Sequence, residues 1–216
     1  MTTSLLGFSY ILAAVLFILS LKWMSEVRTS RRGNWAGSLG MLIAVLTTMV
    51  AYKTQHLDLV LLAFAIGTLI GIPIALKLPM TAVPQRTAMS HAFGSLAVAL
   101  VGTAEYYQRL PGIDTFTMIV LSAEMILGYL TFTGSTIAFL KLQEVISGKP
   151  LIYKGRNLVS GLIVLIAIGS AAGLVLNPLN SIFLPVLVAA ALIFGFLLVM
   201  GIGGADMPTV IAILNS

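Results

Sequence analysis

Seven apolar stretches of about twenty residues constrain this chain more than any other feature, because each can cross a bilayer as a helix. Only 9% of the residues are charged and 59% are hydrophobic. A soluble domain is about a quarter charged, so these stretches could not be hidden in a soluble fold. We therefore predict an all-α integral membrane protein, a polytopic transmembrane helix bundle. The predicted spans are residues 4–22, 35–53, 57–77, 86–107, 115–140, 157–176 and 181–201.

An eighth apolar stretch begins near Met207 and runs only to Ser216. A helix of about ten residues rises roughly 15 Å, which is half the thickness of the hydrocarbon core. We therefore expect a truncated eighth span and a chain that is a fragment. No loop is long enough to form a soluble domain, so residues 1–216 are predicted to be a single transmembrane domain.

The uneven distribution of basic residues predicts the orientation of the bundle. With the amino terminus outside, ten of the twelve Lys and Arg residues fall in inner loops or at inner helix ends, and only Lys53 and Arg109 fall outside. This bias follows the positive-inside rule. The net charge of +5 therefore indicates topology rather than nucleic-acid binding. Basic residues follow the first apolar run instead of preceding it, which favours an uncleaved span over a signal peptide.

The sequence lacks the residues that several kinds of catalytic, nucleotide-binding and metal-binding site require. The chain has no cysteine, and it shows no P-loop, dinucleotide fingerprint, catalytic triad or carboxylate pair. A metal site is not expected, because the second histidine, His56, lies in an outer loop. Three pairs of glycines at four-residue spacing are interpreted as helix-packing positions: Gly33/Gly37, Gly67/Gly71 and Gly169/Gly173.

His91 is the most informative polar residue within a predicted span. Imidazole takes up and releases protons near physiological pH, and titratable groups inside membranes tend to be functional. Two interpretations remain open. His91 is either a proton relay, or a neutral side chain that hydrogen-bonds a neighbouring helix.

Glu124 lies well inside the fifth span and is a second candidate for carrying protons. Thr131 lies two turns further along the same helix face, and Thr133, Ser135 and Thr136 make this span rich in hydroxyl groups. Together these side chains could line a polar seam facing His91. Glu124 could equally be structural, and each hydroxyl could bond back to its own helix.

A glycine-rich segment from Gly201 to Pro208 precedes the last span. We interpret it as a hinge or tight inner turn, with Pro208 in the first turn of a new helix. Asp206 is placed at the inner mouth of that helix, where another domain could contact it. Asn215 lies about two turns further on.

Four stretches of the chain resemble the membrane part of the beta subunit of proton-translocating NAD(P) transhydrogenase. Their order and spacing match along nearly the whole chain. They are residues 29–34 (TSRRGN), residues 89–94 (MSHAFG), residues 131–135 (TFTGS) with 138–142 (AFLKL) and 147–151 (SGKPL), and residues 203–208 (GGADMP) with 214–216 (LNS).

The resemblance implies a function for the whole complex. It would couple hydride transfer from NADH to NADP+ to inward proton movement in the bacterial cytoplasmic (inner) membrane. NAD(H) and NADP(H) would bind to soluble domains, so this fragment alone would hold no cofactor and would not be catalytic. Its implied partners are alpha subunits, the missing NADP(H)-binding domain, a second protomer in a homodimer, and the lipid bilayer, with no nucleic acid.

The resemblance also implies roles for individual residues. His91, Asn215 and Ser135 match positions that line the family's proton channel. Asp206, with Gly203 and Gly204, matches the inner surface that contacts the NADP(H) domain. Glu124 matches no family acid, so its role stays open.

Two other hypotheses fit the composition. A stand-alone proton-coupled secondary transporter would place its substrate between His91 and Glu124. A purely structural subunit would tolerate changes at both positions and at Asn215.

Overall fold

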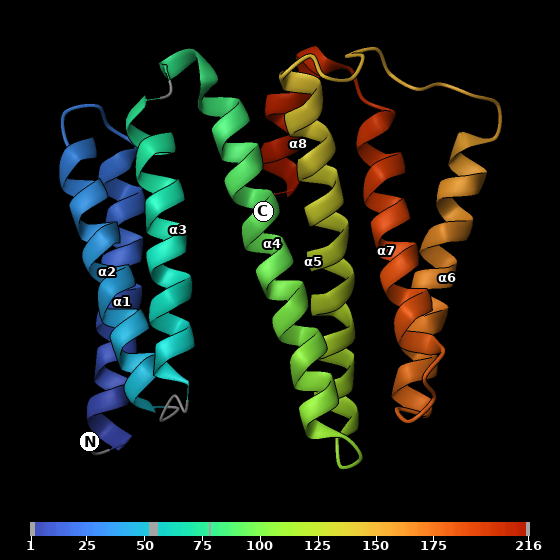
Figure 1. The fold of residues 1–216 in the computed structure, drawn as a ribbon, viewed down its shortest axis with the longest axis horizontal. Coiled ribbons are helices and arrows are strands. Elements are labelled where there is room, and N and C mark those ends of the chain that lie inside the picture. Colours follow the sequence, from blue (N-terminus) through green and yellow to red (C-terminus); the bar gives the residue numbers. More distant parts are fainter. Residues whose placement is uncertain (1–2, 52–55, 78, 215–216) are drawn as a thin grey trace. The chain divides into compact units, whose positions relative to one another are not determined.

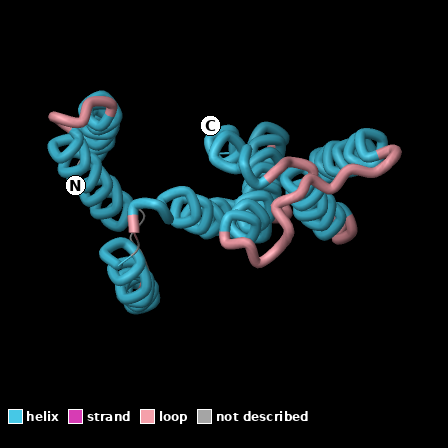
Figure 2. The backbone as a smooth tube through the Cα atoms, turned by 90° about the horizontal axis from the view of Figure 1, so that it is seen from above, coloured by secondary structure: helices cyan, strands magenta, loops and turns pink. Residues whose placement is uncertain are grey.

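The computed structural model describes residues 3–51, 56–77 and 79–214, and over these residues the chain is helical with no strand (Figure 2). Seven helices are long and apolar enough to cross a membrane, as predicted. The helices are α1 (Thr3–Met24), α2 (Ser30–Ala51), α3 (Leu57–Lys77), α4 (Val83–Arg109), α5 (Thr115–Leu142), α6 (Arg156–Leu176), α7 (Phe183–Met200) and the short α8 (Met207–Leu214), with single 3-10 turns at Met80–Ala82 and Gly204–Asp206.

Most predicted spans are slightly shorter than the helices themselves, and α2 differs most. It begins at Ser30 rather than at residue 35, so that Arg31 and Arg32 lie in its first turn. Hydropathy detects the part of a helix that sits in hydrocarbon, whereas the backbone hydrogen bonds continue into the polar boundary of the bilayer. The predicted orientation of the amino terminus stays a prediction.

The chain forms two compact units, residues 1–73 and 74–216, which are described separately. In the first unit α1 and α2 form an antiparallel pair (Figure 1). The Ser20 hydroxyl donates to the Gly33 carbonyl at 2.7 Å. A Cβ atom on Gly33 would lie 2.8 Å from the Ser20 carbonyl oxygen, and one on Gly37 would lie 2.7 Å from the Ser20 hydroxyl. This glycine pair is therefore a packing position, as predicted.

The other two glycine pairs behave differently. No described side chain of α3 is buried, and nothing lies within 4 Å of where a Cβ of Gly67 or Gly71 would stand. On α6, Gly173 packs against the ring of Phe183, at 2.6 Å from its would-be Cβ, whereas Gly169 faces open space. For contacts within a unit, the interpretation as a packing position is thus confirmed for Gly173 but not for Gly67, Gly71 or Gly169.

Helix α5 is the centre of the second unit, because it contacts α4, α6, α7 and α8 (Figure 1). Two glycines allow this close packing. A Cβ on Gly128 would lie 2.8 Å from the Cβ of Ala99 on α4, and a Cβ on Gly195 of α7 would collide with the Leu130 carbonyl of α5. Helices of this kind approach closely through small residues, since lipid provides no hydrophobic force to hold them together.

Two clusters of buried side chains fill the second unit. One joins α4, α5, α6 and α7 and includes Tyr106, Met118, Met125 and Leu187. The hydroxyl of Tyr106 donates to the Pro178 carbonyl at 2.5 Å, which connects α4 to the turn between α6 and α7. The second cluster joins the opposite end of α5 to α4, α7 and α8, and its members are Ala88, Ala138, Val199, Met207, Val210 and Ile211.

Candidate functional site: a histidine and serine between two membrane helices

His91 and Ser135 meet where α4 packs against α5. The Nδ1 atom of His91 lies 3.2 Å from the Ser135 hydroxyl oxygen, and either can donate the hydrogen. Ser135 is completely buried, whereas His91 is partly exposed. Buried Ala88 and Ala92 flank the histidine on its own helix. Both residues were predicted as site residues, and the structure brings them together across forty-four positions of sequence.

A groove of about 420 Å³ opens beside His91. It carries the hydroxyl residues Ser90, Ser95 and Thr131 among apolar neighbours. The Ser95 hydroxyl donates back to the His91 carbonyl at 2.9 Å. Among the described residues, no protein group bonds His91 Nε2. An imidazole with one nitrogen held by a hydroxyl and the other free has the geometry to pass a proton between its two nitrogens.

The hydroxyl-rich face of α5 divides between two neighbours. Thr131 and Ser135, four residues apart and so on one helix face, lie on the side of α4. The predicted polar seam is correct for these two residues. Thr133 instead donates to the Leu192 carbonyl of α7 at 2.9 Å, and Thr136 bonds back to the Phe132 carbonyl at 2.7 Å. The predicted seam is therefore wrong for Thr133, whereas the bond of Thr136 to its own helix leaves its part in the seam a prediction.

Glu124 does not line the groove at His91. Its carboxyl carbon would be 3.4 Å from a Cβ placed on Gly102, which locates it at another level of the contact between α4 and α5. Seven residues separate it from Thr131, about 10 Å along the helix. Among the described residues its carboxylate has no hydrogen-bond partner, so the structure leaves both interpretations of Glu124 open.

The glycine-rich segment forms the predicted tight turn. Its residues 204–206 make a 3-10 turn in which the Asp206 amide donates to the Gly203 carbonyl at 3.1 Å, and α8 then begins at Met207. Pro208 is in the first turn of α8, as expected. Asp206 is exposed. Asn215 lies outside the described residues, but Leu214, the residue before it, lines the groove at His91.

Lys141 is the residue that sequence reasoning missed. It was counted among the basic residues of the inner loops and helix ends, and it does lie in the last turn of α5, but only 3% of it is exposed. Its ammonium donates to the carbonyls of Val199, Met200 and Ile202 at 3.3, 3.1 and 2.7 Å. Residues 137–140 are apolar, but this is also the ordinary setting of a lysine at the end of a span, whose charge reaches the aqueous boundary, so the local sequence carried no signal for its burial.

Comparison with known proteins shows which family the chain belongs to. Residues 6–216 match the family described as NAD(P) transhydrogenase beta subunit. Two curated relatives, both named NAD(P) transhydrogenase subunit beta and both from Rhodospirillum rubrum, are 37% identical to this chain over 223 residues. The alignment covers 100% of this chain and 48% of each relative, so the chain spans about half the length of the curated relatives it matches. The chain therefore belongs to the NAD(P) transhydrogenase beta subunit family.

Proposed function

We propose that residues 1–216 act as one membrane domain that moves protons in a transhydrogenase complex, where inward proton movement drives hydride transfer from NADH to NADP+. The observation that carries this proposal is the pair formed by His91 Nδ1 and the Ser135 hydroxyl at 3.2 Å, beside a groove with further hydroxyl groups. A titratable side chain within membrane helices costs free energy, so one that is present there tends to have a function. Membership of the beta subunit family supports this function over a stand-alone transporter.

Each site residue has a proposed role. His91 accepts a proton from one side of the membrane and releases it toward the other, and Ser135 holds its ring in register. Asn215 extends the path beyond Leu214. Asp206, with Gly203 and Gly204, forms the surface that senses the NADP(H)-binding domain. Glu124 remains a second candidate for carrying protons on the same seam between α4 and α5.

The membrane potential supplies the driving force in this proposal. One charge that crosses 100 mV provides about 2.3 kcal/mol, which is more than a tenfold change in an equilibrium ratio. A path open to both sides at once would dissipate this energy. The domain therefore needs two states, and the occupancy of the NADP(H) domain selects between them.

The proposed assembly extends beyond this chain. NAD(H) and NADP(H) would bind soluble domains outside residues 1–216. An alpha subunit and a second protomer would complete the complex, with the amino terminus of this chain outside a bacterial inner membrane. The relatives are about twice as long as this chain, which leaves room in a full-length subunit for such a domain.

Replacement of His91 tests the proposal directly. His91→Ala in the full-length subunit, assembled with its partners in vesicles, should lower proton movement driven by NADPH and NAD+ at least tenfold, as expected for loss of a general acid–base group. His56→Ala is the matched control, because that histidine is exposed and should be neutral. A His91→Ala complex that moves protons at the normal rate would refute the proposal.

A further inference from the structure

Two cations surround the carboxyl end of α7. The carbonyls of residues 199, 200 and 202 accept from the Lys141 ammonium, and the carbonyl of Gly201 accepts from the Arg156 guanidinium at 3.1 Å. Four consecutive carbonyls are therefore bound by side chains from the end of α5 and the start of α6. Positive groups are favourable at this end of a helix, where the helix dipole is negative.

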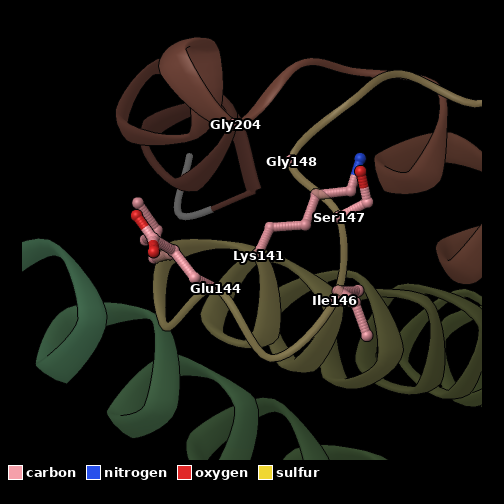
Figure 3. Close-up of a pocket in the computed structure, with 7 residues that line it drawn as sticks. Lys141, Glu144, Ile146, Ser147, Gly148 and Gly204 are labelled. Carbon is pink, nitrogen blue, oxygen red and sulfur yellow. The ribbon is translucent and has the colours of Figure 1, made fainter.

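The charge of Lys141 is stabilised by these carbonyls and hardly by water, unlike the charge of an exposed lysine. Its three N–H donors are all used, and its side chain is almost completely buried. Among the residues that the structure describes, no carboxylate lies within ion-pair distance of it. Figure 3 shows the Lys141 side chain running from α5 toward the segment of Gly148 and Ser147, while the Glu144 carboxylate points elsewhere. Moving the carbonyls away would leave a buried cation without partners, which is strongly unfavourable.

Backbone contacts fasten the same region. The Gly204 amide donates to the Gly148 carbonyl at 2.8 Å, and the Leu151 amide donates to the Met200 carbonyl at 2.8 Å. A Cβ on Gly201 would collide with the Arg156 guanidinium. The turn of residues 201–206 and the loop of residues 143–155 are thus held against each other, with Lys141 beneath both (Figure 3).

This region is connected to His91 by two short routes. Lys141 follows Ser135 by six residues on α5, roughly 9 Å along a rigid helix. The turn also leads into α8, whose Leu214 lines the groove at His91. A Cβ on Gly134 would lie 3.2 Å from the Leu214 side chain and 3.2 Å from the Val199 side chain, so α5, α7 and α8 are tightly packed at this level.

We propose that Lys141 is a positioning residue that fixes the turn of residues 201–206 to α5, so that a displacement of this turn is transmitted to the Ser135–His91 pair. The inference rests on the proposed function and names the residue through which the coupling surface acts on the proton path. Arg156 supports the same turn from the side of α6.

The first experiment compares proton movement with hydride transfer in the same vesicles, using the complete complex. Lys141→Met keeps an unbranched side chain that is one atom shorter and removes the charge. Lys141→Met should lower the number of protons moved per hydride at least fivefold. Lys141→Arg, which keeps the charge, should retain at least half of the ratio of the unaltered complex. Lys154→Met, at an exposed lysine of the adjoining loop, is the matched control and should leave the ratio unchanged. Equal loss of both rates in Lys141→Met, with an unchanged ratio, would overturn the proposal.

A disulfide provides a second test that does not depend on how well Lys141→Met folds. A Cβ on Gly148 would lie 3.7 Å from the Gly204 Cα, and one on Gly204 would lie 3.3 Å from the Gly148 Cα, so the two positions are adjacent, as a disulfide requires. Residues 1–216 contain no cysteine. The Gly148→Cys/Gly204→Cys pair should cross-link on oxidation and lose at least nine-tenths of coupled turnover, with recovery on reduction. Oxidation should not change the activity of either single cysteine variant, whatever its level before oxidation. A cross-linked complex with normal turnover would show that the turn need not move.

The two proposals fail in different ways. Normal proton movement in His91→Ala contradicts the proton relay itself. A loss in His91→Ala, together with unchanged proton-to-hydride ratio in Lys141→Met and normal turnover in the cross-linked pair, leaves the relay standing and removes only the role of Lys141.

Discussion

Replacement of Gly195 by alanine tests the closest helix contact in the second unit. The added Cβ would collide with the Leu130 carbonyl oxygen and the Thr133 hydroxyl of α5. The carbonyl belongs to the backbone, so it cannot rotate away as a flexible side chain would. Helices α5 and α7 must therefore move apart, and the hydrogen bond from Thr133 to the Leu192 carbonyl, 2.9 Å long, must lengthen or break.

Three contributions determine the size of the effect. Overpacking of a well-filled core destabilises by about 1–3 kcal/mol. Loss of the Thr133 hydrogen bond adds about 1 kcal/mol. Exchange of glycine for alanine within a helix returns about 1 kcal/mol, because alanine has less backbone freedom to lose. The expected net destabilisation by Gly195→Ala is therefore about 1–3 kcal/mol.

The measurement is thermal unfolding of the detergent-solubilised subunit, with Gly161→Ala as the control. Gly161 lies on α6 with nothing within 4 Å of a would-be Cβ, so that its replacement should be neutral or stabilising by up to about 1 kcal/mol. The melting temperatures of the two variants should then differ by roughly 2–16 °C. A difference below about 1 °C would show that α5 and α7 are not in contact as described.

Three further predictions concern single residues. Ser135→Ala removes the hydroxyl partner of His91 and should slow proton movement about fivefold in vesicles, the effect of about 1 kcal/mol; an unchanged rate would mean that the hydroxyl does not orient the ring. Hydrogen bonds from the Thr117 hydroxyl and amide hold the pKa of Asp114 below its usual value, so its stabilising contribution is present above pH about 4 and lost as the pH falls lower. Asp114→Asn should flatten the melting temperature between about pH 5 and 3, and an unaltered pH profile would contradict this. Gly33→Ala should destabilise the pair of α1 and α2 by about 1–3 kcal/mol, whereas Gly7→Ala, facing open space, should not; equal melting temperatures for the two would count against the packing of this pair.

The number and type of the helices could be predicted because the thickness of a bilayer sets the length of an apolar stretch. All seven spans appear in the structure. The start of α2 was missed because its first turn carries Arg31 and Arg32, residues that hydropathy assigns to a loop. The contacts between helices were out of reach in another way. Gly67 and Gly71 have the same spacing as Gly33 and Gly37, yet only the second pair packs against a neighbour within its unit.

The chemistry of the site was predictable by residue type, but its geometry was not. A histidine within a membrane span stands out by its cost, so His91 was identified from the sequence. Its pairing with Ser135 rather than with Glu124 depends on the register of α4 against α5, which no local pattern reports. Lys141 was missed because a lysine at the end of a span normally reaches the aqueous boundary, and nothing in residues 137–142 indicates that carbonyls from sixty positions later surround it.

The binding of Lys141 and Arg156 to the end of α7 has a consequence for how the protein is made. Helix α7 carries no charged residue and is the most apolar of the seven spans. A span without basic residues of its own gives the insertion machinery little information about direction, since orientation is set mainly by Lys and Arg near the ends of a span. Its neighbours supply that information, because the end of α5 and the start of α6 bring both charges to it. Biogenesis of α7 thus depends on helices synthesised before it, and loss of either cation should increase the fraction of chains in which α7 inserts the wrong way round.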